Sequence, residues 1–215
     1  MKRRREISWF YWVGRGIGRL LLWSLTRWEI TGKDNVPRDG ALLVVANHVN
    51  LADPPLLAAS IDRKAMIMAK QELFHYPVVS YFLRNLGAFS IRRGQLDRQA
   101  IRQSLQILSE GMALIVFPEG MRSRSGQLRP AFHGAARLAC LSGAQILPVG
   151  IIGTGKLKGP TWLVRRPRIT VNIGRPFTLS PGSKLTKTEL AAHTTSIMRH
   201  IAEMLPPEYH GVYKT

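Results

Sequence analysis

The residues best suited to acid–base chemistry are His48 and Asp53, which follow the first long apolar segment with four residues between them. On a continuous helix their side chains would lie about 140° apart, so only a turn can bring them together. Asp53 precedes Pro54, a pattern that predicts Asp53 as a helix N-cap. Its carboxylate can orient an imidazole and leave one ring nitrogen free to act as a general base. The alternative for this pair, taken alone, is a loop histidine beside a helix cap.

Other polar residues also come directly after apolar segments. Residues 113–117 run into Glu119, Gly120, Arg122 and Ser123, and residues 88–91 run into Arg92 and Arg93. Binding sites of α/β sheets usually form in loops beyond the strand ends. Arginine binds phosphate through a fixed fork of donors. The glutamate and arginines after these other segments indicate that His48 and Asp53 belong to a larger site.

The segments that must position these residues alternate between apolar runs and helical periodicity. We predict strands at residues 41–46, 65–69, 88–91, 113–117, 146–152 and 169–173, and helices at 54–60, 78–86, 96–108, 132–141 and 185–205. Continuous apolar strands between helices are typical of a sheet that is covered on both faces. We therefore predict an α/β fold with a mixed central sheet covered by helices.

Pro148 interrupts the strand predicted over residues 146–152. Proline has no N–H to give to a strand neighbour, so it is disfavoured in the middle of a sheet. Its presence here indicates a sheet edge, a bulge or a stretch of backbone that is open to a ligand.

The charge is strongly basic, with 31 Lys and Arg against 13 Asp and Glu, a net of +18. No acidic residue lies between Glu119 and Glu189. Such a charge favours nucleic acid, an anionic membrane or phosphate-rich substrates as partners. The basic stretch has few aromatic residues for stacking on bases and no zinc-finger spacing, so we expect no nucleic-acid partner.

The first 28 residues combine basic and aromatic side chains. Residues 2–5 are all Lys or Arg, and an aromatic run follows at residues 9–12. Arg15 and Arg19 share one helix face and interrupt the apolar stretch, which is shorter than the roughly 20 residues that span a bilayer. We predict an amphipathic, membrane-associating helical extension that lies in the lipid interface. The alternative is a helix packed on the domain's own core.

These segments together resemble the glycerophospholipid acyltransferase family, and within it the 1-acylglycerol-3-phosphate acyltransferases (PlsC-like). The matching segments are His48 with Asp53 for the His-x4-Asp (HX4D) motif, residues 87–93 for a glycine-led strand ending in arginine (Arg93), residues 117–123 for Phe-Pro-Glu-Gly-Thr-Arg-Ser, and residues 147–149 for an apolar residue before Pro-Val. Lys70 lies in a further family-like segment. Met121 replaces the usual threonine and Asn50 a common serine, which leaves the acceptor lipid open.

The resemblance implies transfer of a fatty acyl chain from acyl-CoA or acyl carrier protein to the sn-2 hydroxyl of 1-acylglycerol 3-phosphate, giving phosphatidic acid. His48 would act as general base and Asp53 would orient it. The residues implied for the acceptor and its phosphate are Arg93, Glu119, Gly120, Arg122 and Ser123, with Glu119 fixing the glycerol backbone or an arginine. Those implied for the donor or the pocket are Lys70, Pro148 and Val149. We expect no cofactor and no metal.

Two alternatives stay open. One is an acyltransferase of this family with another acceptor, such as glycerol 3-phosphate, another lysophospholipid or a lyso-aminolipid. The other is a basic nucleic-acid- or membrane-binding protein, against which the His–Asp pair argues. We expect an interfacial helical region at residues 1–28 and an acyltransferase α/β domain at residues 29–215. The expected location is the cytoplasmic face of the cell membrane, as a peripheral or monotopic protein bound to anionic lipid.

Overall fold

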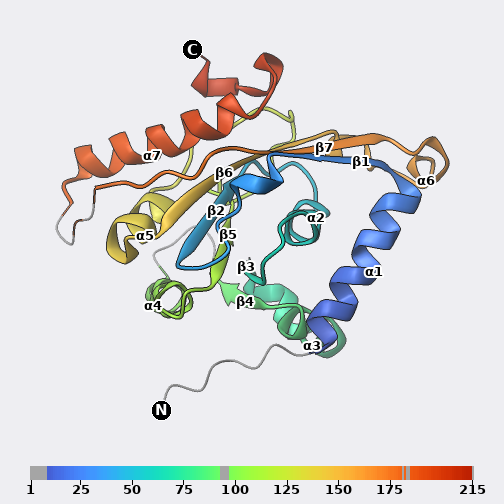
Figure 1. Cartoon of the computed structure of the whole chain (residues 1–215), viewed down its shortest axis with the longest axis horizontal. Coiled ribbons are helices and arrows are strands. Elements are labelled where there is room, and N and C mark those ends of the chain that lie inside the picture. The colour runs from blue at the N-terminus through green and yellow to red at the C-terminus, as the bar shows by residue number, and fades with distance from the viewer. Residues whose placement is uncertain (1–8, 93–96, 181, 183–184, 215) are drawn as a thin grey trace.

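A seven-stranded sheet forms the centre of the computed structural model, which describes residues 9–92, 97–180, 182 and 185–214 (Figure 1). The strands are β1 (Arg27–Thr31), β2 (Leu42–Ala46), β3 (Ala65–Lys70), β4 (Ala88–Ile91), β5 (Ala113–Val116), β6 (Gln145–Ile152) and β7 (Arg168–Ile173). Their order across the sheet is β1-β7-β6-β2-β5-β3-β4. All neighbours are parallel except β6 and β7, so the predicted mixed sheet is confirmed.

Helices cover both faces of this sheet. They are α1 (Trp9–Leu25), α2 (Asp53–Ser60), α3 (Pro77–Asn85), α4 (Arg98–Ser109), α5 (Gly134–Ser142), α6 (Trp162–Arg165) and α7 (Lys187–Glu203). One core cluster joins the sheet to α4, α5 and α7, and a second joins its other face to α2. Every strand and helix predicted between residues 41 and 205 is present, to within a few residues at the ends.

The strand β2 shows why the sheet could be read from the sequence. Leu43 and Val45 pack in the first cluster, whereas Leu42 and Val44 pack in the second. Both faces of the strand are therefore buried, and its sequence is continuously apolar. By contrast, the prediction missed the edge strand β1, whose residues are all exposed or only partly buried.

Pro148 lies in β6, a central strand between β2 and β7, and not at a sheet edge. The ladder shifts beside it. Val149 pairs with Ile173 but Ile146 pairs with Phe177, so the partner segment has one residue more than β6. The bulge falls beside Pro148, which has no N–H to donate. Of the three alternatives for this proline, the bulge is therefore confirmed.

The helix α1 packs on α2 through its basic face. Arg15 donates to the carbonyl of Ile61 at 2.5 Å and Arg19 to the carbonyl of Ala59 at 2.9 Å. Carbonyls at a helix C-terminus lack partners within the helix, so arginine stabilises them. Asp62 accepts from both arginines as well. The two arginines share one face, as predicted, but that face is directed at the domain.

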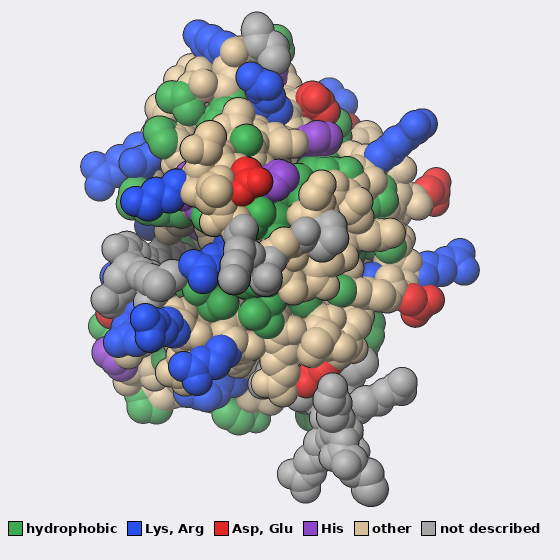
Figure 2. Space-filling view, turned by 90° about the vertical axis from the view of Figure 1, so that its left-hand side faces the viewer, with side chains coloured by type: hydrophobic (Ala, Val, Ile, Leu, Met, Phe, Trp, Pro, Cys, Tyr) green, Lys and Arg blue, Asp and Glu red, His purple; other side chains and the backbone are tan. Residues whose placement is uncertain are grey.

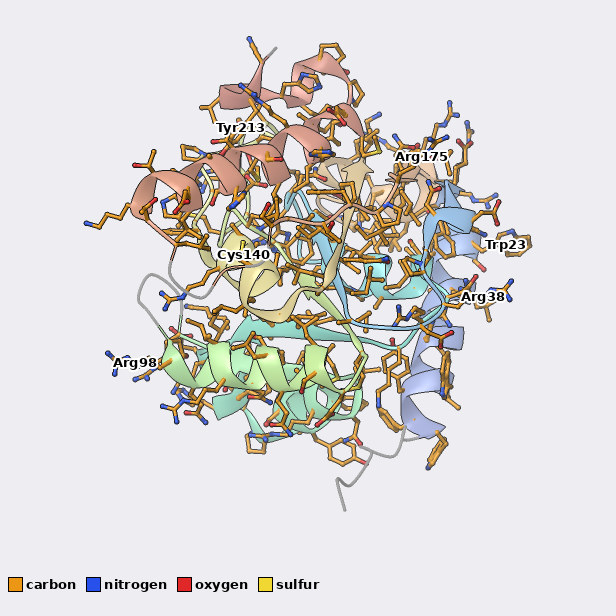
Figure 3. All side chains as sticks on the ribbon, turned by 60° about the vertical axis from the view of Figure 1, so that its left-hand side comes forward. Trp23, Arg38, Arg98, Cys140, Arg175 and Tyr213 are labelled. Atoms are coloured by element: carbon orange, nitrogen blue, oxygen red, sulfur yellow. The ribbon has the colours of Figure 1, made fainter. Side chains whose placement is uncertain are left out.

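Beside this basic face, α1 has large apolar side chains that are exposed. They are Trp9, Trp12, Val13, Ile17, Leu20, Leu21 and Trp23. Trp23 points away from the rest of the molecule (Figure 3). Over the described part of the chain, α1 and the other helices are too short or too polar to cross a membrane. The basic segment at residues 2–5 lies outside the described residues.

Candidate active site

The loop between β2 and α2 brings His48 and Asp53 together. β2 ends at Ala46 and α2 begins at Asp53, so the chain reverses direction between them. Asp53 Oδ2 lies 2.8 Å from His48 Nδ1. The aspartate is 0% exposed and the histidine 4% exposed. The turn expected from the sequence is therefore present, and the two side chains are in hydrogen-bond contact.

Asp53 is not the N-cap predicted from the sequence, because Ala52 occupies that position and Asp53 is the first residue of α2. Leu56, the third residue after it, donates its N–H to the carbonyl of Ala52, and Pro55 has no N–H to offer a capping carboxylate. Asp53 Oδ2 instead accepts from the backbone N–H groups of Val49 and Asn50, at 2.6 and 2.7 Å. One oxygen therefore holds both the loop backbone and the ring of His48.

The imidazole of His48 is fixed on a second side by an aromatic ring. Phe117 stacks on it with the ring centroids 4.4 Å apart. Nδ1 is occupied by Asp53, whereas Nε2 has no hydrogen-bond partner among the described residues. His48 lines a cavity of the described structure, and Nε2 is the ring nitrogen that Asp53 leaves free. The arrangement meets the geometric requirement for a general base.

The cavity beside His48 has a volume of about 570 Å³ and lies between the sheet and the helices α4 and α5. Its wall is mainly apolar, with Met68, Ile101, Ile115, Phe132, Leu138 and Leu190 among the lining residues. A cavity of this size and character suits an aliphatic chain or another apolar group. Among the described lining residues that follow a strand closely, His48 is the one whose side chain can accept and donate a proton near neutral pH.

Glu119 lies behind the histidine, where it is 2% exposed and does not line the cavity. Its Oε1 accepts from the backbone N–H of His48 and its Oε2 from that of Arg129, both at 3.0 Å. Burial raises the pKa of Glu119 from 4.5 to about 7, and the two backbone donors oppose that rise. The carboxylate therefore holds the histidine loop, whereas the family resemblance implied that it fixes the glycerol backbone or an arginine.

The segment after β5 also contacts the β2–α2 loop, which carries His48, through its backbone. The N–H of Ser123 donates to the carbonyl of His48 at 2.7 Å. Gly120 has a φ of +67°, and a Cβ there would lie 2.8 Å from the ring of Phe132. Only glycine fits this turn. Gly120 and Met121 both line the cavity, so a methionine side chain stands where the family motif has threonine.

Of the arginines expected to bind phosphate, the structure describes Arg122, which is not part of the buried His48–Asp53 pair. Arg122 is exposed and makes no ion pair among the described residues, and Arg124 is the same in both respects. Arg93 lies outside the described residues. On the face shown in Figure 2, many Lys and Arg side chains gather on the left, beside patches of hydrophobic surface. This charge suits an anionic substrate or surface.

Three other predicted residues are not brought to the cavity. Lys70 ends β3 and pairs with Glu72 at 3.2 Å. Pro148 and Val149 are buried inside β6, and neither lines the cavity. These three residues therefore belong to the sheet or to its end, and not to the cavity wall.

The cavity also has polar lining residues that were not among the predicted site residues, although Arg92 was noted at the end of an apolar segment. Arg92 follows β4, and His133 and Arg137 come from the start and middle of α5. His133 Nδ1 lies 2.9 Å from the hydroxyl of Thr194, so it has a neutral partner where His48 has a carboxylate. These residues belong to different elements, and no spacing in the sequence indicates that they meet.

Comparison with known protein families gives one match, to the acyltransferase family, over residues 27–152. A crystal structure of the 1-acyl-sn-glycerophosphate acyltransferase PlsC from Thermotoga maritima is similar to this chain, with a TM-score of 0.70 and 28% identity. It covers 90% of this chain and 79% of its own.

Curated relatives carry related names. The 1-acyl-sn-glycerol-3-phosphate acyltransferase of Streptococcus pneumoniae is 34% identical over 180 residues, covering 82% of this chain and 66% of that protein. A lyso-ornithine lipid O-acyltransferase of Pseudomonas aeruginosa is 34% identical over 141 residues, covering 62% of this chain and 53% of that protein. The chain spans 43% to 66% of the length of four relatives, the S. pneumoniae protein among them.

Proposed function

This chain belongs to the acyltransferase family, and from that membership we propose that it transfers a fatty acyl chain to the free sn-2 hydroxyl of 1-acylglycerol 3-phosphate. The product is phosphatidic acid, and the donor is acyl-CoA or acyl carrier protein, with no further cofactor. The observation that carries the proposal is the buried contact between His48 Nδ1 and Asp53 Oδ2 at 2.8 Å. It supports His48 as a base directed at the apolar cavity.

In the proposed mechanism, His48 Nε2 removes the proton from the acceptor hydroxyl as its oxygen attacks the thioester carbonyl carbon. The tetrahedral intermediate then expels the thiolate, which takes the proton back from the imidazolium and leaves as a thiol. Asp53 keeps Nδ1 protonated and stabilises the imidazolium. Positioned base catalysis of this kind contributes about 10²–10⁴-fold to the rate.

The apolar cavity supports a long-chain substrate. His48 and Phe117 line it at the strand ends, and from there it extends between α4 and α5. An acyl chain in this space would place its thioester beside the histidine. The exposed guanidinium of Arg122, in the loop after β5, is our candidate for the acceptor phosphate.

A second acceptor class is favoured by one comparison and one residue. The P. aeruginosa relative is named a lyso-ornithine lipid O-acyltransferase. Met121 lines the cavity where the family motif has threonine, so the acceptor side of this chain is more apolar. A lyso-aminolipid is therefore the alternative acceptor to assay.

Membrane association is part of the proposal. α1 exposes three tryptophans together with aliphatic side chains. Tryptophan suits the boundary between lipid and water. The net charge of +18 favours an anionic leaflet. We place the protein at the cytoplasmic face of the membrane, as a peripheral or monotopic protein.

The experiment that tests this function is product analysis by mass spectrometry. The purified chain is mixed with acyl-CoA or acyl carrier protein and with 1-acylglycerol 3-phosphate, glycerol 3-phosphate or lyso-ornithine lipid. We expect phosphatidic acid as the main product. Product from lyso-ornithine lipid alone would select the second acceptor, and no acylated product from any pair would refute acyl transfer.

A further inference from the structure

The helix α3 receives almost no support from the protein core. None of its residues is buried, although its sequence contains two valines, a tyrosine, a phenylalanine and a leucine. Val78 is 69% exposed, Tyr81 is 58% exposed and Phe82 is 49% exposed. Isolated helices shorter than about 12 residues are marginal in water, and α3 has nine residues. An exposed apolar helix of this kind is typical of a surface that another apolar phase covers.

Aromatic contacts join α3 to the start of α1. The ring of Phe10 lies 5.9 Å from that of Tyr81 and 5.8 Å from that of Phe82. A Cβ at Gly14 would lie 2.6 Å from Leu86, so glycine at this position permits the close approach of the two segments. The exposed apolar face of α1 therefore continues onto α3.

The charge around α3 is basic. Residues 63–92 contain five Lys or Arg and one acidic residue, Glu72, which pairs with Lys70. Arg84 lies over the ring of Phe74, 5.5 Å from its centroid, and remains exposed. Aromatic and aliphatic side chains bordered by exposed cations are complementary to the acyl and headgroup layers of an anionic bilayer.

The position of α3 also connects it with the cavity. The strand β4 runs directly from α3 to Ile91 and Arg92, which line the cavity. A bilayer that covers α3 would therefore lie at the sheet edge next to the cavity. α1 alone does not achieve this, because it packs at the C-terminal end of α2, away from the strand ends that carry His48.

We infer that α3, together with the first turn of α1, is a second lipid-contacting surface that lies in the interface of an anionic bilayer and holds the β4 side of the cavity against it. The choice of lipid as the partner rests on the proposed function. The surface itself rests on the exposure of α3, its aromatic link to α1 and its basic border.

The test compares two valine-to-glutamate variants in co-sedimentation with vesicles of phosphatidylethanolamine and phosphatidylglycerol. Val78→Glu places a charge on α3, and Val212→Glu places the same charge on a similarly exposed valine near the C-terminus. We expect Val78→Glu to bind vesicles about tenfold or more weakly, since an apolar contact is replaced by a buried charge. Val212→Glu is expected to bind like the unchanged chain.

Equal binding by the two variants would overturn the inference, because α1 would then suffice. A change from dimer to monomer in Val78→Glu, without vesicle binding by the unchanged chain, would also overturn it and assign the surface to a second copy. Acyl transfer to acceptor dispersed in detergent is measured in parallel. Absence of transfer in every sample would refute the proposed function while the vesicle comparison still decides the surface.

Discussion

The backbone N–H of His48 donates to Oε1 of Glu119 at 3.0 Å, so a buried carboxylate after β5 holds the loop that carries the histidine. The other oxygen of Glu119 accepts from Arg129, which ties the loop to a third segment. The side chain of Glu119 thus joins the third family motif to the backbone of the first, behind the cavity. Glu119 acts on the histidine by positioning it, and its conspicuous place in the motif does not require contact with substrate.

The first prediction concerns the pH dependence of stability. Because the pKa of Glu119 rises from 4.5 to about 7 on folding, the native chain binds more protons than the unfolded chain between these pH values. The stability associated with Glu119 is thus present below pH 4.5 and is lost as the pH rises to about 7. Glu119→Gln removes this dependence.

Denaturant unfolding at several pH values measures this difference. The unfolding free energy of the unchanged chain, minus that of Glu119→Gln, should fall by about 3 kcal/mol from pH 4.5 to pH 8. A difference that stays constant with pH would mean that the glutamate has an ordinary pKa.

A second prediction concerns Arg122 and uses Arg124 as its matched control. Both are exposed and lie in the same loop. If Arg122 binds the acceptor phosphate, Arg122→Ala should raise the apparent KM for 1-acylglycerol 3-phosphate about tenfold, the usual worth of a charged hydrogen bond. The donor KM should stay unchanged, and Arg124→Ala should have a much smaller effect. Equal acceptor KM values in Arg122→Ala and Arg124→Ala would show that Arg122 does not bind the acceptor phosphate.

A third prediction concerns chain length. Ala100 lines the cavity from α4 and is 3% exposed. Ala100→Leu adds three carbon atoms where the acyl chain is proposed to lie, so it should shift the preference toward shorter donors. Competition between a short and a long acyl-CoA measures the shift, because the product ratio does not depend on how much enzyme is folded. An unchanged ratio would place the acyl chain elsewhere.

Much of the fold could be predicted because its strands are buried on both faces and therefore continuously apolar. The edge strand β1 was not predicted, because only its residues Trp28 and Ile30 contact the core and charged residues alternate with them. The contact between His48 and Asp53 could be predicted from a short turn. The prediction that Asp53 is an N-cap was wrong because its carboxylate accepts from the loop before α2, and Ala52 holds the N-cap position.

Other features of the site depend on tertiary contacts that spacing does not encode. Glu119 binds backbone N–H groups, which every residue offers, so its partners depend only on how distant segments meet. The orientation of Arg15 and Arg19 toward α2 also depends on a tertiary contact. Their common face could be predicted, but its contact with the end of α2 could not.

The most direct test of the central claim is the rate of phosphatidic acid formation by His48→Ala and His133→Ala. Both histidines line the cavity, but only His48 has a carboxylate partner. With acyl-CoA and 1-acylglycerol 3-phosphate at saturation, we predict that kcat falls at least about 100-fold in His48→Ala. It should fall less than about tenfold in His133→Ala, a loss below the range of a positioned base. A near-unchanged kcat in His48→Ala, with both variants folded by circular dichroism, would contradict the assignment of His48 as the base.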